Sequence, residues 1–214
     1  MNFFGHAAIA GQFREDPVFV LGAMLPDFWG MLGLRAPEPT SGPLGAGVRF
    51  HHVTDGAFHE LDAFRAFCRD GAALLDARGV RRGTARAVAH VGVELFLDAE
   101  LAGNPAAREL YFEALRAGQQ REHFAQTTLL PADSARLEGL ARALEMRGVA
   151  EKPDTELLVT RLERALAARP RLAIEPRDRD AVTEWVELFR PRVVASAPRI
   201  VSELTSAIER TLVT

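Results

Sequence analysis

The stretch "RGTARAVAHVGVELFLDAELAG", residues 82–103, decides the fold that this sequence predicts. It is rich in alanine, begins near Thr84 and ends by Gly103, which is the pattern of a long α-helix. Its apolar residues occur on all sides of that helix, so we expect the helix to be buried. A buried helix needs several other helices around it, and the sequence on both sides of this stretch supplies them.

Helical periodicity continues along most of the chain, whereas β-branched residues seldom alternate with polar ones. The further helices that we expect cover residues 59–79, 132–148 and 153–170, the last of these capped by Asp154 or Thr155, and one from about Asp178 that is interrupted at Pro191 and Pro198. The proline- and glycine-rich residues 35–47 form the clearest loop. The sequence therefore predicts an all-α fold.

The composition is that of an ordinary globular protein, since 48% of the 214 residues are apolar and 26% are charged. We predict one domain over residues 1–214, with a metal-site half at residues 1–103 and supporting helices at residues 104–214. Five of the six histidines lie in residues 1–98, so the chemistry is expected in the first half. The single cysteine, Cys68, excludes an internal disulfide framework and is expected to pack in the core.

Charge and hydropathy limit the partners that the chain can have. The formal net charge is −3, and basic residues are not interleaved with aromatic ones, so we expect no nucleic-acid surface. No stretch approaches the roughly 18–20 apolar residues of a membrane span. The start lacks the basic region of a secretory signal, and we therefore expect a cytoplasmic protein. The sequence leaves its oligomeric state open.

The buried helix carries polar residues where apolar ones are expected. His90, Glu94 and Asp98 stand four residues apart, which puts them on nearly one face. A buried carboxylate is costly unless it is paired, hydrogen-bonded or bound to a metal. Asp98 is equally compatible with solvating the end of its helix, but His90 and Glu94 indicate a cation that faces this stripe.

The stretch "HHVTDGAFHE", residues 51–60, contains a second pair with the same spacing, His51 and Asp55. Two helices that each offer an imidazole and a carboxylate can bring four ligands to one point, as in helix-bundle metal sites. His52 and His59 could bind the metal directly or support its ligands. An exposed helix pair without a metal is equally compatible with His51 and Asp55.

Two further candidate ligands lie upstream, and basic residues precede the buried helix. His6 follows an apolar start, and Asp27 ends an apolar run. A core histidine and a turn-forming aspartate are the commoner roles of such residues. Arg81, Arg82 and Arg86 could meet a phosphate group or only solvate the start of their helix.

The order of these motifs resembles that of a known family, the acyl carrier protein phosphodiesterases. The opening "MNFFGH" is similar to the start of that family and carries His6. "LGAMLPDF" is similar to the acidic segment of the family and carries Asp27, and "GVRFHHVTD" is similar to its His-x3-Asp stretch. A basic pair followed by "HVGVELFLD" completes the order, and the resemblance covers about residues 1–103.

The resemblance implies an HD-domain-like helical bundle with a metal site between its helices. It also implies a divalent metal such as manganese, acyl carrier protein as a partner, and hydrolysis of the phosphopantetheine phosphodiester. The family has Asp-x3-Asp where this chain has His90 and Glu94, and a basic residue where it has His52. A site richer in nitrogen favours zinc, iron or another transition metal over magnesium.

A second resemblance, to helical zinc-dependent phospholipases C and nucleases, rests on "LGAMLPDF" and on the two pairs of histidine and acid. Those enzymes are typically exported and use a processed N-terminal tryptophan, whereas this sequence opens with Met1. A third alternative is a non-catalytic helical scaffold, in which the metal is structural or the polar stripe is only a hydrogen-bond network.

We therefore predict a metal-dependent phosphodiesterase or phosphohydrolase that binds a phosphodiester substrate and one or two divalent transition-metal ions (Mn, Zn or Fe). The predicted metal ligands are His6, Asp27, His51, Asp55, His90 and Glu94. A general base is expected among the acids that do not bind metal, a proton donor among the remaining histidines and a phosphate-binding fork in the basic pair. The residues predicted for these catalytic roles are Asp55, Glu94, Asp98, His52, His59, Arg81 and Arg82.

Overall fold

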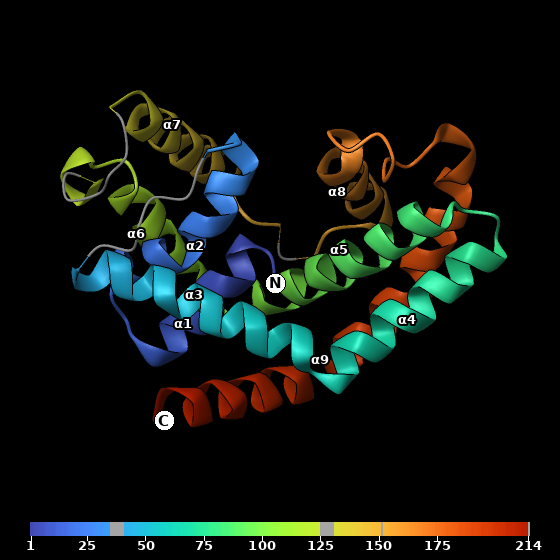
Figure 1. The fold of residues 1–214 in the computed structure, drawn as a ribbon, viewed down its shortest axis with the longest axis horizontal. Coiled ribbons are helices and arrows are strands. Elements are labelled where there is room, and N and C mark those ends of the chain that lie inside the picture. Colours follow the sequence, from blue (N-terminus) through green and yellow to red (C-terminus); the bar gives the residue numbers. More distant parts are fainter. Residues whose placement is uncertain (35–40, 125–130, 151, 214) are drawn as a thin grey trace. The chain divides into compact units, whose positions relative to one another are not determined.

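The computed structural model describes residues 1–34, 41–124, 131–150 and 152–213, and these residues form an all-α fold without strands (Figure 1). The predicted all-α class is therefore confirmed, whereas the HD-domain-like arrangement stays a prediction. The α-helices are α1 Phe3–Phe13, α2 Pro17–Leu32, α3 Gly42–Glu60, α4 Asp62–Ala77, α5 Arg82–Leu101, α6 Pro105–Ala117, α7 Pro131–Arg147, α8 Thr155–Ala167 and α9 Arg179–Val213. Two short 3-10 helices are η1 Arg121–Phe124 and η2 Pro176–Asp178. None of the described helices combines the length and the apolar character that a bilayer crossing requires.

The helices form two compact units, each built from two separate segments of the chain. Unit 1 contains Met1–Gly56 and Leu101–Ala150, and unit 2 contains Ala57–Glu100 and Glu151–Thr214. Each unit combines residues from both predicted halves, so the units do not follow the predicted boundary at residue 103. The prediction that the whole chain is one domain stays a prediction.

In unit 1, α1, α2 and α6 pack against one another, and α7 packs on α2 and α6. Asp16 caps α2 by accepting hydrogen bonds from two backbone amides of the first turn, and Asn104 caps α6 in the same way. Tyr111 of α6 meets Phe4 of α1 edge-on, with the ring centroids 5.1 Å apart. This packing buries His6 on α1, whose exposed fraction is 1%.

α2 and α3 approach each other so closely that Gly22 and Gly47 are required at the crossing. A Cβ atom built on either glycine would overlap a backbone carbonyl oxygen of the other helix. Residues 42–47, which were expected to end a loop, are helical, and this part of the loop prediction was wrong. The reason is that glycine serves helix packing here rather than a turn. Of the rest of the predicted loop, residue 41 forms a bend, and residues 35–40 lie outside the described residues.

In unit 2, α4 and α5 lie side by side (Figure 1), and α9 packs on α4 and α8. Trp185 of α9 is fully buried, and its ring stacks on Phe96 of α5 with the centroids 5.3 Å apart. Gly92 of α5 and Gly71 of α4 both face this indole, and a Cβ atom on Gly92 would overlap it. The indole therefore sets the spacing of three helices and fixes α5, the helix that carries His90.

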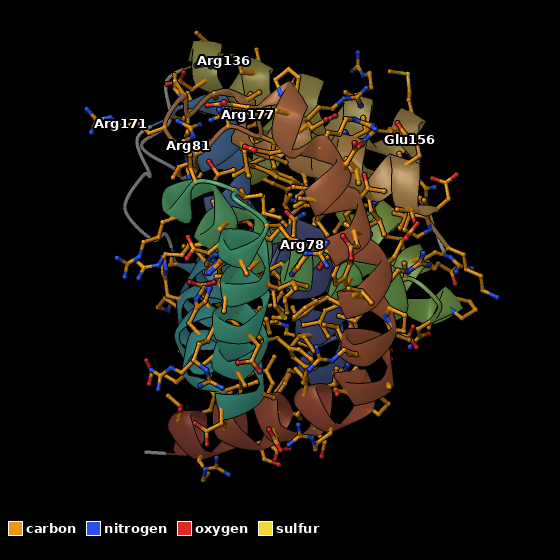
Figure 2. The ribbon with its side chains drawn as sticks, turned by 90° about the vertical axis from the view of Figure 1, so that its right-hand side faces the viewer. Arg78, Arg81, Arg136, Glu156, Arg171 and Arg177 are labelled. Carbon is orange, nitrogen blue, oxygen red and sulfur yellow. The ribbon has the colours of Figure 1, made fainter. Side chains whose placement is uncertain are left out.

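α9 runs through Pro191 and Pro198 without a break in its helical structure, so the predicted interruption was wrong. The helix instead changes direction sharply along its length (Figures 1 and 2). Proline removes one backbone hydrogen bond, and a helix that is supported by its neighbours bends at such a point rather than ending. The predicted cap of α8 is confirmed, because Asp154 accepts a hydrogen bond of 2.8 Å from the Leu157 amide.

Candidate functional site

The first candidate site lies in unit 2, where the last turn of α3 meets the middle of α5. One stripe of α5 consists of residues at successive four-residue intervals, namely Arg82, Arg86, His90 and Glu94. His59 belongs to the last turn of α3. His59, His90 and Glu94 each offer one ligand atom, and these atoms lie within 4.8 Å of one another.

The three ligand atoms have the spacing of a metal site. His90 Nε2 lies 3.1 Å from Glu94 Oε1, and His59 Nε2 lies 3.6 Å from the same oxygen. The two Nε2 atoms are 3.3 Å apart. Neighbouring ligand atoms of a tetrahedral zinc site are about 3.3 Å apart, because each lies about 2 Å from the ion. The three atoms therefore outline one face of a tetrahedron of the right size.

The surroundings of Glu94 favour the ionised state that a metal ligand needs. Burial raises the pKa of the Glu94 carboxyl, but positive charge and the hydrogen bonds from His59 and His90 lower it, and the resulting pKa lies below the usual range of glutamate. The carboxylate is therefore ionised and its side chain is only 13% exposed. Phe64 flanks both imidazoles, with a distance of 5.2 Å from its ring centroid to each. A carboxylate ligand held between two imidazoles is the His2Glu donor set of catalytic zinc sites, which leave a fourth position open.

A cavity of about 460 Å³ opens beside His90, between α4 and α5. Its size falls in the range of small-molecule sites, roughly 300–1,000 Å³. Its walls combine small apolar side chains with charged ones, and the lining residues are Cys68, Arg69, Ala72, Ala73, Asp76, Arg82, Ala85, Arg86 and His90. Three arginines against one aspartate make this cavity positively charged.

Two of these arginines are available to a ligand. Arg82 and Arg86 are exposed, and neither has an ion-pair partner within the described ranges of the chain. Arg69 differs, because its Nε donates to the Asp70 carboxylate at 3.1 Å. The sequence had indicated Arg82 and Arg86 but not Arg69 or Asp76. The seven-residue spacing of Arg69 and Asp76, which places both on one face of α4, was a signal that could have identified them.

A second candidate group lies in unit 1 and joins three helices. His6 of α1, Asp27 of α2 and His51 of α3 each offer one ligand atom within 4.8 Å of the others. The rings of His6 and His51 are stacked, with their centroids 3.9 Å apart. Asp27 follows Pro26 inside α2 rather than at a turn. Three of the six predicted metal ligands therefore meet in unit 1, whereas His90 and Glu94 belong to the group in unit 2.

His51 is held in a state that suits metal binding. Its Nδ1 donates a hydrogen bond of 2.8 Å to the Ala23 carbonyl oxygen, and this leaves a lone pair on Nε2. Burial, followed by the nearby His6, lowers the pKa of the His51 imidazole to about 3. The ring is therefore neutral at pH 7, and a hydrogen bond from its other nitrogen to a carbonyl is typical of a metal-binding histidine.

The remaining predicted site residues lie around these two groups. Asp55 Oδ1 is 3.7 Å from His6 Nε2 and 3.6 Å from the terminal amine of Met1. His52 is exposed, and its ring meets His51 edge-on at 5.4 Å. Asp98 is buried one turn beyond Glu94 on α5 and belongs to neither group of candidate ligands among the described residues.

Arg81, the other member of the predicted basic pair, does not line the cavity. Arg81 lies near Arg177 (Figure 2). Both side chains pair with Glu175, with nitrogen–oxygen distances of 3.2 and 2.9 Å. Arg81 also donates a hydrogen bond of 3.2 Å to the Ala173 carbonyl. These contacts fix the start of α5 to the segment before η2.

The thiol of Cys68 lines the cavity but is poorly suited to act as a nucleophile. Burial, followed by the charge of Glu94, raises its pKa to about 12. The thiol is therefore protonated at neutral pH, and a thiol rather than a thiolate is a weak nucleophile and a weak metal ligand.

Comparison with known proteins identifies no relative. No family model matches the chain, and neither a curated protein nor a solved structure is significantly similar to it. The function therefore has to be argued from the two groups of candidate ligands and from the charged cavity.

Proposed function

We propose that the protein is a metal-dependent hydrolase of phosphoric diesters. The observation that carries this proposal is the arrangement in unit 2, where the face of a metal tetrahedron formed by His59, His90 and Glu94 adjoins a cavity with three arginines. A transition metal with an open position suits hydrolysis, and arginines beside it favour a substrate with phosphate charge. The group of His6, Asp27 and His51 offers a second ion a buried site in unit 1.

The residues of the site have distinct tasks in this proposal. His59, His90 and Glu94 hold the ion, and the low pKa of Glu94 keeps the carboxylate charged when it does so. A divalent ion held there would supply charge stabilisation for a phosphoryl oxygen and lower the pKa of water. The arginines of the cavity draw the anionic substrate toward His90, and Phe64 covers the imidazoles on one side. The His-rich donor set supports zinc, iron or manganese over magnesium.

Two families remain as models for this activity. The motif order that resembles acyl carrier protein phosphodiesterases supports an HD-domain-like arrangement and a phosphopantetheine diester as substrate. The His2Glu donor set supports the second candidate, a zinc-dependent phospholipase C or nuclease-like hydrolase. A non-catalytic scaffold with a structural ion would differ from both hydrolase families because it would hydrolyse no diester.

Elemental analysis joined to substrate assays tests the proposal. We expect at least one equivalent of a transition metal per chain after reconstitution, and cleavage of bis-p-nitrophenyl phosphate that is lost on chelation. Release of phosphopantetheine from holo acyl carrier protein would assign the first family, and cleavage of phosphatidylcholine the second. Less than about a tenth of an equivalent of any transition metal, or bound metal without cleavage of any of these three diesters, would refute the proposal.

A further inference from the structure

The charged residues on one face of α5 fall into two groups, candidate metal ligands toward its end and arginines toward its start. Glu94 and His90 form the metal-binding end, and Arg86 and Arg82 follow one and two turns toward the start of α5. Four residues of α-helix span about 6 Å, so the arginine Cα atoms lie about 6 and 12 Å from that of His90 along the axis. The Cα–Cβ bonds of a helix all tilt toward its N-terminus, so the four side chains leave the helix in parallel and keep this order along its face.

One cavity joins the two ends, because His90 lines it together with Arg82 and Arg86. The opposite wall comes from α4, where Ala72 and Ala73 leave room between the helices. The free guanidinium groups can each form a two-pronged, charge-assisted contact with a phosphate or carboxylate. Asp76 on the same wall repels a ligand that is anionic over its whole length. It can, however, accept a hydrogen bond from a hydroxyl group that lies between two anionic ends.

We propose that Arg82 and Arg86 form a subsite for a second anionic group of the substrate, separate from the phosphoryl group at the metal. The substrate is then a phosphodiester in which one of the two esterified halves carries a phosphate or carboxylate about one or two helical turns from the scissile bond. This inference rests on the proposed function, because it takes the metal end as the place of hydrolysis. It narrows the substrate class from any diester to one with two anionic groups.

A matched pair of substrates tests the subsite directly. The p-nitrophenyl ester of thymidine 5′-phosphate is compared with the same ester that also bears a 3′-phosphate, using the metal-reconstituted full chain. We expect kcat/KM to be at least about tenfold higher for the doubly anionic ester, the order of one charge-assisted hydrogen bond. The Arg86→Ala and Arg82→Ala variants should each reduce this preference to below about threefold. The Arg210→Ala variant removes an exposed arginine that does not line the cavity and should retain the preference.

A binding measurement separates failure of the subsite from failure of the proposed function. We expect inorganic phosphate to bind the metal-free protein in chelator, by isothermal titration calorimetry, and the Arg86→Ala variant to bind it at least about tenfold more weakly. Such binding without any diesterase activity would refute the proposed function and support the anion subsite. Equal kcat/KM values for the two esters, or a preference that both arginine variants retain, would overturn the subsite while the hydrolase stands. Circular dichroism confirms that each variant is folded.

Discussion

The imidazole of His51 is neutral because its surroundings exclude a proton. Burial and the neighbouring His6 lower its pKa, and the hydrogen bond to the Ala23 carbonyl fixes which nitrogen keeps its hydrogen. An unfolded chain places no such restriction on this ring. The difference between the two states links the stability of the metal-free protein to pH.

We expect the free energy of unfolding of the metal-free protein to decrease as the pH falls from 6.5 toward 3. The pKa of His51 is lowered from 6.5 to about 3 on folding, so the unfolded chain binds the additional proton in this range. Above pH 6.5 the imidazole is neutral in both states, and the free energy of unfolding does not depend on its titration. Below pH 6.5 the free energy of unfolding falls by up to about 1.4 kcal/mol per pH unit because of this group. Urea denaturation at several pH values measures the slope. A His51→Gln variant should show a shallower slope, and His123→Gln, which alters a histidine of η1 that is hydrogen-bonded to Gln120, should keep that of the wild type. An unchanged slope in His51→Gln would contradict this assignment.

Glu94 distinguishes a metal site from a network of hydrogen bonds. Glu94→Gln keeps the shape of the side chain but removes its charge, so metal affinity should fall at least about tenfold. The melting temperature in the presence of metal should fall as well. If no cation faced Glu94, the same change would relieve the cost of burying a charge and raise the melting temperature. Metal titration and thermal melting measure both effects, and Glu100→Gln, an exposed acid of the same helix, is the control.

The pairing of His90 with Glu94 could be predicted because it depends only on helical spacing. The contact of His59 with this pair could not, since it depends on where the end of α3 meets α5. For the same reason, the sequence assigned His51 and Asp55 to one pair by spacing, while the structure also brings Asp55 within 3.7 Å of His6 on another helix. Local periodicity identifies which residues share a face, but it does not identify the face that lies opposite.

At the scale of the helices, Gly47 shows why one predicted boundary failed. A glycine-rich segment usually indicates a loop, because glycine lowers helix propensity. In this chain the absence of a side chain allows α3 to contact the backbone of α2, and packing outweighs propensity. The bounds of α8 were predicted closely because its N-cap residue, Asp154, directly precedes the helix and is recognisable from the local sequence.

We expect Gly47→Ala to reduce the free energy of unfolding by at least about 2 kcal/mol. The added methyl group would overlap the backbone of α2, which cannot move away without loss of packing. The matched change Gly139→Ala lies on α7, where no atom lies within 4 Å of an added Cβ. That variant should gain about 0.5–1 kcal/mol from the better helix propensity of alanine. Urea denaturation followed by circular dichroism compares the two variants. A Gly47→Ala protein as stable as the wild type would mean that α2 and α3 do not approach as closely as described.

At the scale of the molecule, the chain passes between its two compact units three times: inside α3, at the last residue of α5, and between residues 150 and 151. Composition could not reveal this arrangement, because the division does not coincide with a change in residue types or with a proline-rich linker. The predicted boundary at residue 103 followed the distribution of the histidines. The units follow packing, in which α6 covers α1 and α2, and α9 covers α4.

A fragment of residues 1–103 is therefore expected not to fold on its own. It lacks α6, which packs on α1 and α2, and α9, which buries Trp185 beside α4 and α5. Thermal unfolding followed by circular dichroism should show no cooperative transition for the fragment under conditions in which the full chain melts sharply. A fragment that melts cooperatively would favour the predicted division at residue 103 over the two interleaved units.

The order of charges along α5 has a consequence for the helix itself. α5 has no acidic residue in its first turn and no basic residue in its last turn, and Arg82 and Arg86 lie near its start. The free amides at the start of a helix already carry a partial positive charge, so the cationic side chain of Arg82 in the first turn opposes the helix dipole by roughly 0.3–1 kcal/mol. An anion held by these arginines would neutralise both sources of charge at once. The contacts of Arg81 with Glu175 and Ala173 hold this end of α5 in place, so an empty cavity leaves the charge repulsion as a cost to the stability of the folded protein. An anion that binds there removes this cost, and stability and occupancy of the cavity therefore rise together.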